Sequence, residues 1–408
     1  GYVLNYKLRE ISAEEFAQFN ENVSQGSFLQ TPEMAELMMA NGWEVTLLAV
    51  QSDKIEMAAL LGAKNMTGGK HYEIQYGPIY QEYQEDVEKF FYKELRQFVK
   101  DHGGMELLVI PNTNYQEFDS AGNALTAENK QFIQSMQELN YEHTGLEVGY
   151  NKRGESTWHY VKDLSDIADD KKLLKSYTKD GQYSVKKTQQ FGIRVRPLAY
   201  EELDKFKKIT SETSERRGYD DHDLPYYQSL YKTFGDKAEF LVAEINFADY
   251  EAAILAQMDK LTGQIEKTKK EGKRKELESQ LETQKVRLAE AREFIAQHGR
   301  EDIILAGSLF IYGASETIYL FSGSYEAFKK LYAPFAIQHY VMKKTLDKGV
   351  KSYNFFGVAG TFDGTDGVLH FKQNFAGYVV RKVGYFNYYP KPVKHKVLSM
   401  VKTLLGRK

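Results

Sequence analysis

The fold is decided by residues 319–375, which read YLFSGSYEAFKKLYAPFAIQHYVMKKTLDKGVKSYNFFGVAGTFDGTDGVLHFKQNF. The apolar run at 317–321 predicts a strand, and the Ser-Gly-Ser sequence at 322–324 predicts a break after it. Residues 325–347 predict a long helix, and the aromatic residues of 352–358 predict a second strand. A strand, a helix and a second strand in this order are typical of an α/β fold.

A crevice is expected at the ends of these two strands, where strand–helix–strand units place functional side chains. After the glycine-rich loop 357–367, the pair Phe371-Lys372 puts a cation beside an aromatic ring. Such a pair suits a site where negative charge is bound or develops. The alternative is an ordinary lysine at the end of a strand. Tyr319 and Ser322 are the other side chains that we expect to face the crevice.

Helices and strands alternate along the rest of the chain, which predicts a mixed α/β fold in two halves. The expected helices are 12–23, 32–41 and 83–101, and the expected strands are 43–50, 55–66, 72–76, 105–110, 192–198, 238–247 and 303–312. Segments 74–110 and 320–358 follow the same order of elements, and we interpret them as weak repeats of one unit. No Pro/Ser-rich linker separates the halves, so we expect them to pack closely.

Residues 250–298 carry apolar side chains at heptad spacing on both sides of a charged run around Gly272. Two such helices joined by a short turn predict an antiparallel coiled-coil hairpin. We expect this arm to be inserted in a second domain formed by 146–249 and 299–390, after a first domain at 1–145. Its charged faces suit contact with RNA or are simply solvated, and both interpretations stay open.

The C-terminal segment 391–408 is basic and predicts an amphipathic helix. Its apolar face is formed by Val393, Val397, Met400, Val401 and Leu404, and the surrounding basic residues are Lys394, Lys396, Lys402, Arg407 and Lys408. One interpretation is a last helix docked on the first domain. The other is a helix attracted weakly to an anionic membrane surface.

The composition excludes several classes of protein. A net charge of −3 over 408 residues excludes a globally basic nucleic-acid binder, so any RNA contact needs a local patch. The absence of cysteine excludes thiol catalysis and fits a reducing compartment. No apolar run reaches the roughly 18 residues of a membrane span, and none has the form of a signal peptide. We therefore expect a cytoplasmic protein, and without a metal-binding or nucleotide-binding motif we expect neither metal nor cofactor.

The chain resembles a known family at several motifs in the same order. The C-terminal signature of the FemA/FemB/FemX/MurM/MurN family is similar to Tyr353-Asn354-Phe355-Phe356-Gly357-Val358, Gly367-Val368 and His370-Phe371-Lys372-Gln373-Asn374-Phe375. Weaker similarities lie at 28–31, 141–145 and 243–247, so the resemblance runs nearly end to end. It implies two GNAT-like (acetyltransferase-like) domains with mixed sheets, plus the inserted coiled-coil arm.

The resemblance also implies a reaction. Enzymes of this family move an amino acid from aminoacyl-tRNA to the branch on the stem-peptide lysine of lipid-linked peptidoglycan precursor. The run Gln30–Met34 resembles members of the MurN type, which implies alanine as the donor, with serine or glycine as alternatives. The partners implied are aminoacyl-tRNA, the lipid-linked precursor, the inner face of the membrane and a paralogous transferase. The alternative function is a precursor-binding subunit without catalysis.

The family pattern assigns roles to particular residues. Lys372 with Phe371 matches the family's catalytic pair. The expected substrate-binding residues are Arg216, Arg217, Tyr219, Tyr226, Tyr319 and Ser322, and the expected tRNA-binding residues are Lys186, Lys187, Lys269, Lys270, Lys273 and Arg274. Arg216 with Tyr219 or Tyr226 is the expected site for the diphosphate of the precursor. Two alternatives stay open: Phe321 could replace Tyr319, and the two arginines could pair with Asp220, Asp221 and Asp223.

Four departures from the family pattern remove charge. Met38 and Tyr76 stand where relatives carry a lysine and an arginine, and Ile110-Pro111 replaces an Asp-Pro pair. The basic run expected after the first helix of the second domain is reduced to Gly181-Gln182-Tyr183. These changes affect mainly the first-domain end of the expected cleft.

Overall fold

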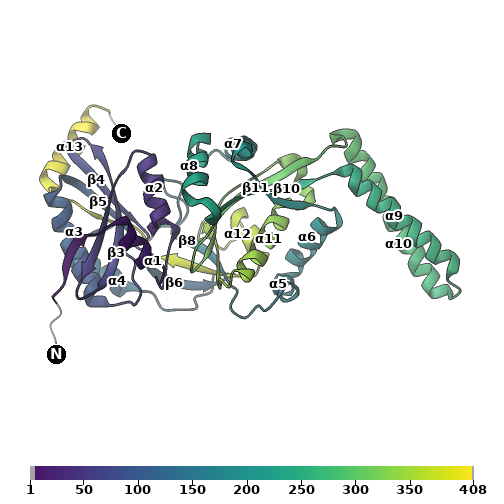
Figure 1. Ribbon diagram of the computed structural model, residues 1–408, viewed down its shortest axis with the longest axis horizontal. Coiled ribbons are helices and arrows are strands. Elements are labelled where there is room, and N and C mark those ends of the chain that lie inside the picture. Colours follow the sequence, from purple (N-terminus) through teal and green to yellow (C-terminus); the bar gives the residue numbers. More distant parts are fainter. Residues whose placement is uncertain (1–4, 407–408) are drawn as a thin grey trace.

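A seven-stranded mixed sheet forms the core of the N-terminal half in the computed structural model, which describes residues 5–406 (Figure 1). Its order is β1 (Lys7–Glu10), β2 (Glu44–Gln51), β3 (Ile55–Met66), β4 (Gly69–Gln75), β5 (Gly104–Ile110), β15 (Phe386–Tyr388) and β7 (Glu142–His143). Only β4 and β5 run parallel. The helices of this half are α1 (Ala13–Asn20), α2 (Pro32–Ala40), α3 (Glu85–Asp101) and α4 (Lys130–Glu138).

An eight-stranded sheet forms the core of the second half. Its order is β6 (Asn114–Asp119), β14 (Tyr378–Lys382), β8 (Trp158–Asp163), β13 (Ser352–Val358), β12 (Thr317–Ser324), β11 (Ile303–Tyr312), β10 (Ala238–Ile245) and β9 (Arg194–Pro197). Its helices are α5 (Asp170–Ser176), α6 (Lys179–Gln190), α7 (Leu203–Arg217), α8 (Leu224–Phe234), α11 (Ala333–Asp347) and α12 (Gly367–Gln373). Only β12 and β13 run parallel, so β4–α3–β5 and β12–α11–β13 are corresponding units and the predicted repeat is confirmed.

The two halves exchange strands and share a core. β6 lies in the second sheet although it follows β5 of the first, and β15 lies in the first sheet although it follows β14 of the second. One buried cluster also joins β3 of the first sheet, through Ala58 and Leu60, to β10 and β11 of the second, through Phe240 and Leu309. The expected close packing of the halves is confirmed.

The predicted break at 322–324 is wrong, because β12 continues to Ser324. Gly323 allows α7 to lie directly on the strand: a Cβ atom there would be 2.8 Å from both Ile209 Cγ2 and Thr213 Oγ1. The backbone N–H of Ser324 donates to Thr213 Oγ1 at 3.1 Å. The predicted helix therefore starts late, at Ala333, after a 3₁₀ segment η4 (Glu326–Leu331).

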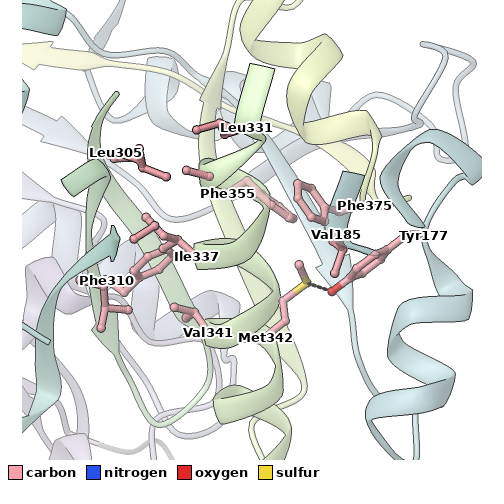
Figure 2. Close-up of a cluster of buried hydrophobic side chains, with 14 of the residues drawn as sticks. Tyr177, Val185, Leu305, Phe310, Leu331, Ile337, Val341, Met342, Phe355 and Phe375 are labelled. Atoms are coloured by element: carbon pink, nitrogen blue, oxygen red, sulfur yellow. Dashed lines mark hydrogen bonds between the residues drawn. The ribbon is translucent and has the colours of Figure 1, made fainter. Parts of the chain in front are cut away.

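Helix α11 covers one face of the second sheet and closes its largest core cluster. Figure 2 shows Ile337, Val341 and Met342 of α11 among aromatic side chains of the sheet and of neighbouring segments. The Tyr177 hydroxyl lies 3.8 Å from Met342 Sδ and fixes the packing of α11 against the segment before α6.

The arm is an antiparallel helical hairpin formed by α9 (Phe247–Lys267) and α10 (Glu271–His298), as predicted. It projects from the second half, on the side away from the first (Figure 1). Its base belongs to the main core, because Phe247 stacks on Phe294 at 4.8 Å and Ile254 and Ala291 are buried. Towards the tip, the charged side chains are exposed.

Helix α13 (Pro392–Leu404) docks on the first sheet. Lys394 Nζ donates to the Gly68 carbonyl at 2.8 Å, and His395 Nε2 lies 3.4 Å from Glu106 Oε2. The side chains of the predicted apolar face do not take part in this docking and are exposed, Val393 by 76% and Leu404 by 84%. Arg407 and Lys408 lie outside the described residues. Between residues 5 and 406 no helix combines the length and the apolar character that crossing a bilayer requires.

Candidate active site

The site forms where β12 and β13 stop pairing. Their parallel ladder contains only Thr317 opposite Tyr353 and Ile318 opposite Asn354, although both strands continue. The pairing of β13 with β8 is also irregular between Asn354 and Gly357, where Phe356 has a φ of 66°. Backbone groups beyond the last pair lack neighbours in the ladder and need other partners.

Lys372 supplies one of these partners. Its Nζ donates to the Gly357 carbonyl at 2.7 Å and lies 5.7 Å from the centre of the Tyr319 ring. The residue is only 5% exposed. Burial lowers the pKa of Lys372 to about 7, and the Asp366 carboxylate opposes that shift. Lys372 is therefore a buried lysine on a helix, and not an exposed lysine at the end of a strand.

Lys372 lies on a short helix, α12, and Asp366 fixes the start of that helix. One Asp366 oxygen accepts from the Val368 N–H at 3.1 Å, as a helix cap, and the other accepts from the Ala359 N–H at 2.9 Å. Asp366 thus attaches the start of α12 to the end of β13, and Lys372 on this helix reaches the Gly357 carbonyl of the strand. Phe371 beside it packs edge-on against Phe335 at 5.0 Å.

Tyr319 lies beside Lys372, and Ser322 lies beside Tyr319, on a part of β12 that contains an irregularity. The register against β11 shifts between Leu309 and Phe310, so that Leu309 faces Phe321 and Phe310 faces Tyr319. Burial raises the pKa of Tyr319, and the Ser322 and Ser308 hydroxyls oppose the rise, which places these three hydroxyl groups together.

Phe321, the alternative to Tyr319, lies elsewhere. Its ring packs at 5.0 Å from His222 and 6.0 Å from Tyr227, on α8 and the loop before it. Tyr226 belongs to the same aromatic group, since it stacks on His222 at 4.0 Å. The structure therefore does not bring Tyr226 to Lys372.

The two adjacent arginines at the end of α7 differ in their partners. Both terminal nitrogens of Arg216 lie 3.3 Å from the Ser324 carbonyl, and Glu212 and Glu326 lie 3.7 Å away. The side chain of Arg217 has no hydrogen bond or ion pair within the described part of the chain. Its charge opposes the burial-driven rise in the pKa of Tyr319 and of Tyr219, so it lies near both.

Neither arginine pairs with the neighbouring aspartates, so that alternative is wrong. Asp221 accepts from Lys207 Nζ, Thr210 Oγ1 and the Tyr227 hydroxyl at 2.6–2.7 Å. Asp223 caps α8 by accepting from the Tyr226 N–H.

The residues expected to contact tRNA fall into two groups. Lys269, Lys270, Lys273 and Arg274 lie at the tip of the arm, far from α12 (Figure 1). Lys186 and Lys187 lie on α6, at the base of the arm. The structure does not bring these two groups together.

Sequence analysis missed two further lysines: Lys162, which is buried, and Lys382, which is half-buried. Lys162 Nζ donates to the Phe375 carbonyl at 2.7 Å, and Lys382 Nζ to Asn114 Oδ1 at 2.8 Å and Asn112 Oδ1 at 3.0 Å. Burial lowers the pKa of each lysine to about 8. Lys162 shares the alternation of Trp158 and Tyr160 along β8, and a lysine in phase with two inward aromatics is the signal that could have identified it.

His159 on the same strand was also missed. Its Nε2 lies 3.2 Å from the Tyr76 hydroxyl, and it is 2% exposed. Burial lowers its pKa far below the usual value, and the charges of Lys382 and Lys372 add to that effect. A neutral imidazole therefore joins the two halves beside Lys372.

The departures from the family pattern are packed positions. Tyr76 has a φ of 54° and its hydroxyl meets His159. The Met38 methyl group lies against Gly62, where an added Cβ would come within 2.4 Å of it. Ile110 is 3% exposed at the end of β5. Apolar packing and a hydroxyl–imidazole contact thus occupy positions where charge was expected.

Comparisons with known proteins agree with this architecture. The model of the FemAB family matches residues 11–403. An aminoacyltransferase FemA from Staphylococcus aureus (strain bovine RF122 / ET3-1) is 29% identical over 412 residues, which cover 96% of this chain and 97% of FemA. FemA from strain N315 has the same identity and coverage.

The fold agrees as well. A crystal structure of FemX superposes with a TM-score of 0.77 at 19% identity, covering 95% of this chain and 98% of FemX. The expected α/β fold of two GNAT-like domains is confirmed. With a family model that spans residues 11–403, the chain belongs to the FemAB family.

Proposed function

We propose that this aminoacyltransferase moves an amino acid from aminoacyl-tRNA to the branch on the stem-peptide lysine of lipid-linked peptidoglycan precursor. The product would be a lengthened interpeptide bridge. The observation that carries the proposal is the buried Lys372 ammonium at the point where β12 and β13 separate.

The chemistry requires stabilisation of negative charge. The branch amine attacks the ester carbonyl of the donor, an oxyanion forms, and the ester bond then breaks to release the ribose hydroxyl of tRNA, which takes up the proton lost by the amine. A lysine ammonium has three donors, and Lys372 uses one on Gly357, so two remain for the oxyanion. Because Lys372 is buried, each such donor acts more strongly than in water.

We assign the binding site for the diphosphate of the precursor to the end of α7. The Arg217 guanidinium lies near Tyr219 and Tyr319 and has no partner among residues 5–406, whereas Arg216 is held by the Ser324 carbonyl. A guanidinium matches the oxygens of a diphosphate group. We therefore assign the diphosphate of the precursor to Arg217 and Tyr219, rather than to Arg216 and Tyr226.

We assign the contact with the membrane surface to α13. Its exposed apolar face, with Val397, Met400 and Leu404, is flanked by Lys396 and Lys402. Such a helix suits the surface of an anionic bilayer, where a lipid-linked precursor is found.

The test is a transfer assay with purified lipid-linked precursor and tRNA charged with radiolabelled alanine, serine or glycine. We expect label in the precursor from one of these donors, with alanine first. Lys351→Met, which changes an exposed lysine near β13, should transfer as well as the unchanged protein. Absence of label with all three donors would refute the proposal.

A further inference from the structure

A groove of about 450 Å³ lies at the base of the arm and is separate from the site around Lys372. It is formed by α6, by the part of α10 nearest the body, and by the segment around η4. Its polar and aromatic lining consists mainly of Tyr183, Lys187, Arg287, Glu290, Lys330 and Tyr332. This volume is within the range of small-ligand sites.

The groove is positively charged. Lys187, Arg287 and Lys330 come from three different elements, and none has an ion pair or a side-chain hydrogen bond to any residue between 5 and 406. Among the described residues that line the groove, Glu290 is the only one with a carboxylate. Unpaired cations that converge from separate elements favour a ligand with more than one negative group.

Aromatic rings stand among these cations. Tyr183 is 54% exposed, and Tyr332 meets it edge-on at 6.2 Å. Lys187 Nζ lies 5.7 Å from the centre of the Tyr183 ring. Tyr332 has a φ of 59°, a rare conformation for a residue other than glycine that often marks functional positions. An exposed ring beside a cation offers a surface on which a planar group can stack.

A row of aromatic contacts connects the groove to the candidate active site. Tyr332 meets Phe335 at 6.1 Å, and Phe335 meets Phe371 at 5.0 Å. Phe371 is the neighbour of Lys372. The row of contacts gives the direction in which a chain-like ligand would extend from the groove to reach the lysine.

We propose that this groove binds the single-stranded 3′ end of the RNA donor, with phosphates on Lys187, Arg287 and Lys330 and a nucleobase stacked on Tyr183. Cations that follow a backbone and an aromatic ring that accepts any base are the combination that single-stranded nucleic acids use. The inference rests on the proposed function, since it supplies the binding site for the donor of that reaction.

The experiment measures RNA binding without any transfer. Two probes are compared by fluorescence anisotropy: an RNA hairpin with a single-stranded 3′ extension, and the same hairpin with a flush end. We expect the unchanged protein to prefer the extended hairpin. Tyr183→Ala should weaken binding of the extended hairpin by about fivefold or more, and leave the flush hairpin unaffected.

The cations are tested by their salt dependence. For the extended hairpin, replacing Lys187, Arg287 and Lys330 together by glutamine should reduce the slope of log affinity against log salt by about 0.7 per lost phosphate contact, or about 2 in all. Lys285→Gln is the control. Lys285 lies on α10, as Arg287 does, but it pairs with Glu282 at 3.0 Å. This variant should leave the slope unchanged.

The outcomes separate this inference from the proposed function. If the unchanged protein transfers label but Tyr183→Ala and the triple variant bind the extended hairpin normally, the groove is excluded as the RNA-binding site. The transferase proposal then stands. Equal affinity of the unchanged protein for both hairpins also refutes the groove. If neither RNA binds and no label is transferred, the proposed function fails with it.

Discussion

At the scale of single residues, Lys372 has the environment of an oxyanion donor. It is buried, and its ammonium donates to the Gly357 carbonyl. Lys372→Met keeps most of the volume of the side chain and removes its charge. Because loss of one oxyanion donor typically lowers turnover by about 10²–10³, we expect a fall of that size in kcat, with precursor affinity changed much less.

Steady-state kinetics with varied precursor concentration would check this prediction. A variant whose precursor affinity falls while kcat is unchanged would show that Lys372 holds a ground-state phosphate instead. If both kcat and precursor affinity change by less than about threefold in Lys372→Met, Lys372 has no role in the reaction.

The pH dependence of kcat follows from the same residue. The ammonium form is the one that can stabilise an oxyanion, and burial lowers the pKa of Lys372 to about 7. The active form is therefore lost as the pH rises, and kcat should fall on the basic side of a midpoint of about 7. Rates measured at saturating substrate from pH 5.5 to pH 9 would show this limb. The same limb in Lys372→Met would assign it to another group.

Sequence analysis could identify Lys372 but not its full surroundings. The Phe371-Lys372 pair was visible as a motif, whereas α12 has only seven residues and is too short for a helical period. Arg216 and Arg217 are adjacent and identical in type, so only the contact with Ser324 distinguishes them. Lys382 meets Asn112 across about 270 residues of chain, a contact that no local pattern encodes.

At the scale of elements, Gly323 explains why a predicted break is a strand. Serine and glycine usually mark turns, but here the missing Cβ allows α7 to approach β12. Gly323→Ala would place its Cβ 2.9 Å from the Ile209 carbonyl oxygen, so strand and helix must separate. We expect a loss of about 1–3 kcal/mol in the free energy of unfolding, measured with urea.

Gly263→Ala on α9 is the matched control. Apart from the backbone of α9 itself, no atom of residues 5–406 lies within 4 Å of an added Cβ there, and alanine is the better helix former. This variant should be as stable as the unchanged protein or slightly more stable. Equal stability of both variants would contradict the close approach of α7.

The arm can be shortened but not removed at its base. Ile254, Leu288 and Ala291 belong to the core of the second half, so removal of the whole hairpin would expose that core. Replacing 263–281 by a short glycine linker removes the basic tip and keeps these residues. We expect a folded protein with unchanged precursor binding and a lower kcat/KM for aminoacyl-tRNA. Unchanged kinetics would exclude the tip from RNA binding.

At the scale of the whole molecule, the exchange of β6 and β15 could not be predicted from sequence. Both strands are short, and β15 pairs with β5, which lies nearly 280 residues earlier in the chain. Local patterns gave the α/β class, the repeated unit and the arm because these depend on neighbouring residues. Strand exchange depends on contacts between the halves, and it ties them into one unit.

The two ends of the molecule also divide the proposed partners. In Figure 1 the arm projects from one end, and α13 lies at the other. If the groove at the base of the arm receives RNA, α13 can meet a bilayer at the same time. This arrangement lets a large donor and a membrane-held acceptor approach Lys372 from different sides.

The vesicle binding of α13 is the corresponding prediction. Val397 and Leu404 are 52% and 84% exposed, so Val397→Asp with Leu404→Asp should leave the fold intact. The change places two negative charges on the face that would enter the bilayer, beside Lys396 and Lys402, each of which contributes about 1 kcal/mol near an anionic surface. We expect the unchanged protein to sediment with vesicles containing phosphatidylglycerol, less so at high salt, and the double variant to remain in the supernatant. Leu125→Asp alters another exposed apolar residue, which lies beside β6 and is 58% exposed, and this variant should sediment normally. If the double variant sediments as well as the unchanged protein, α13 is not the membrane contact, and the precursor must be reached by another surface.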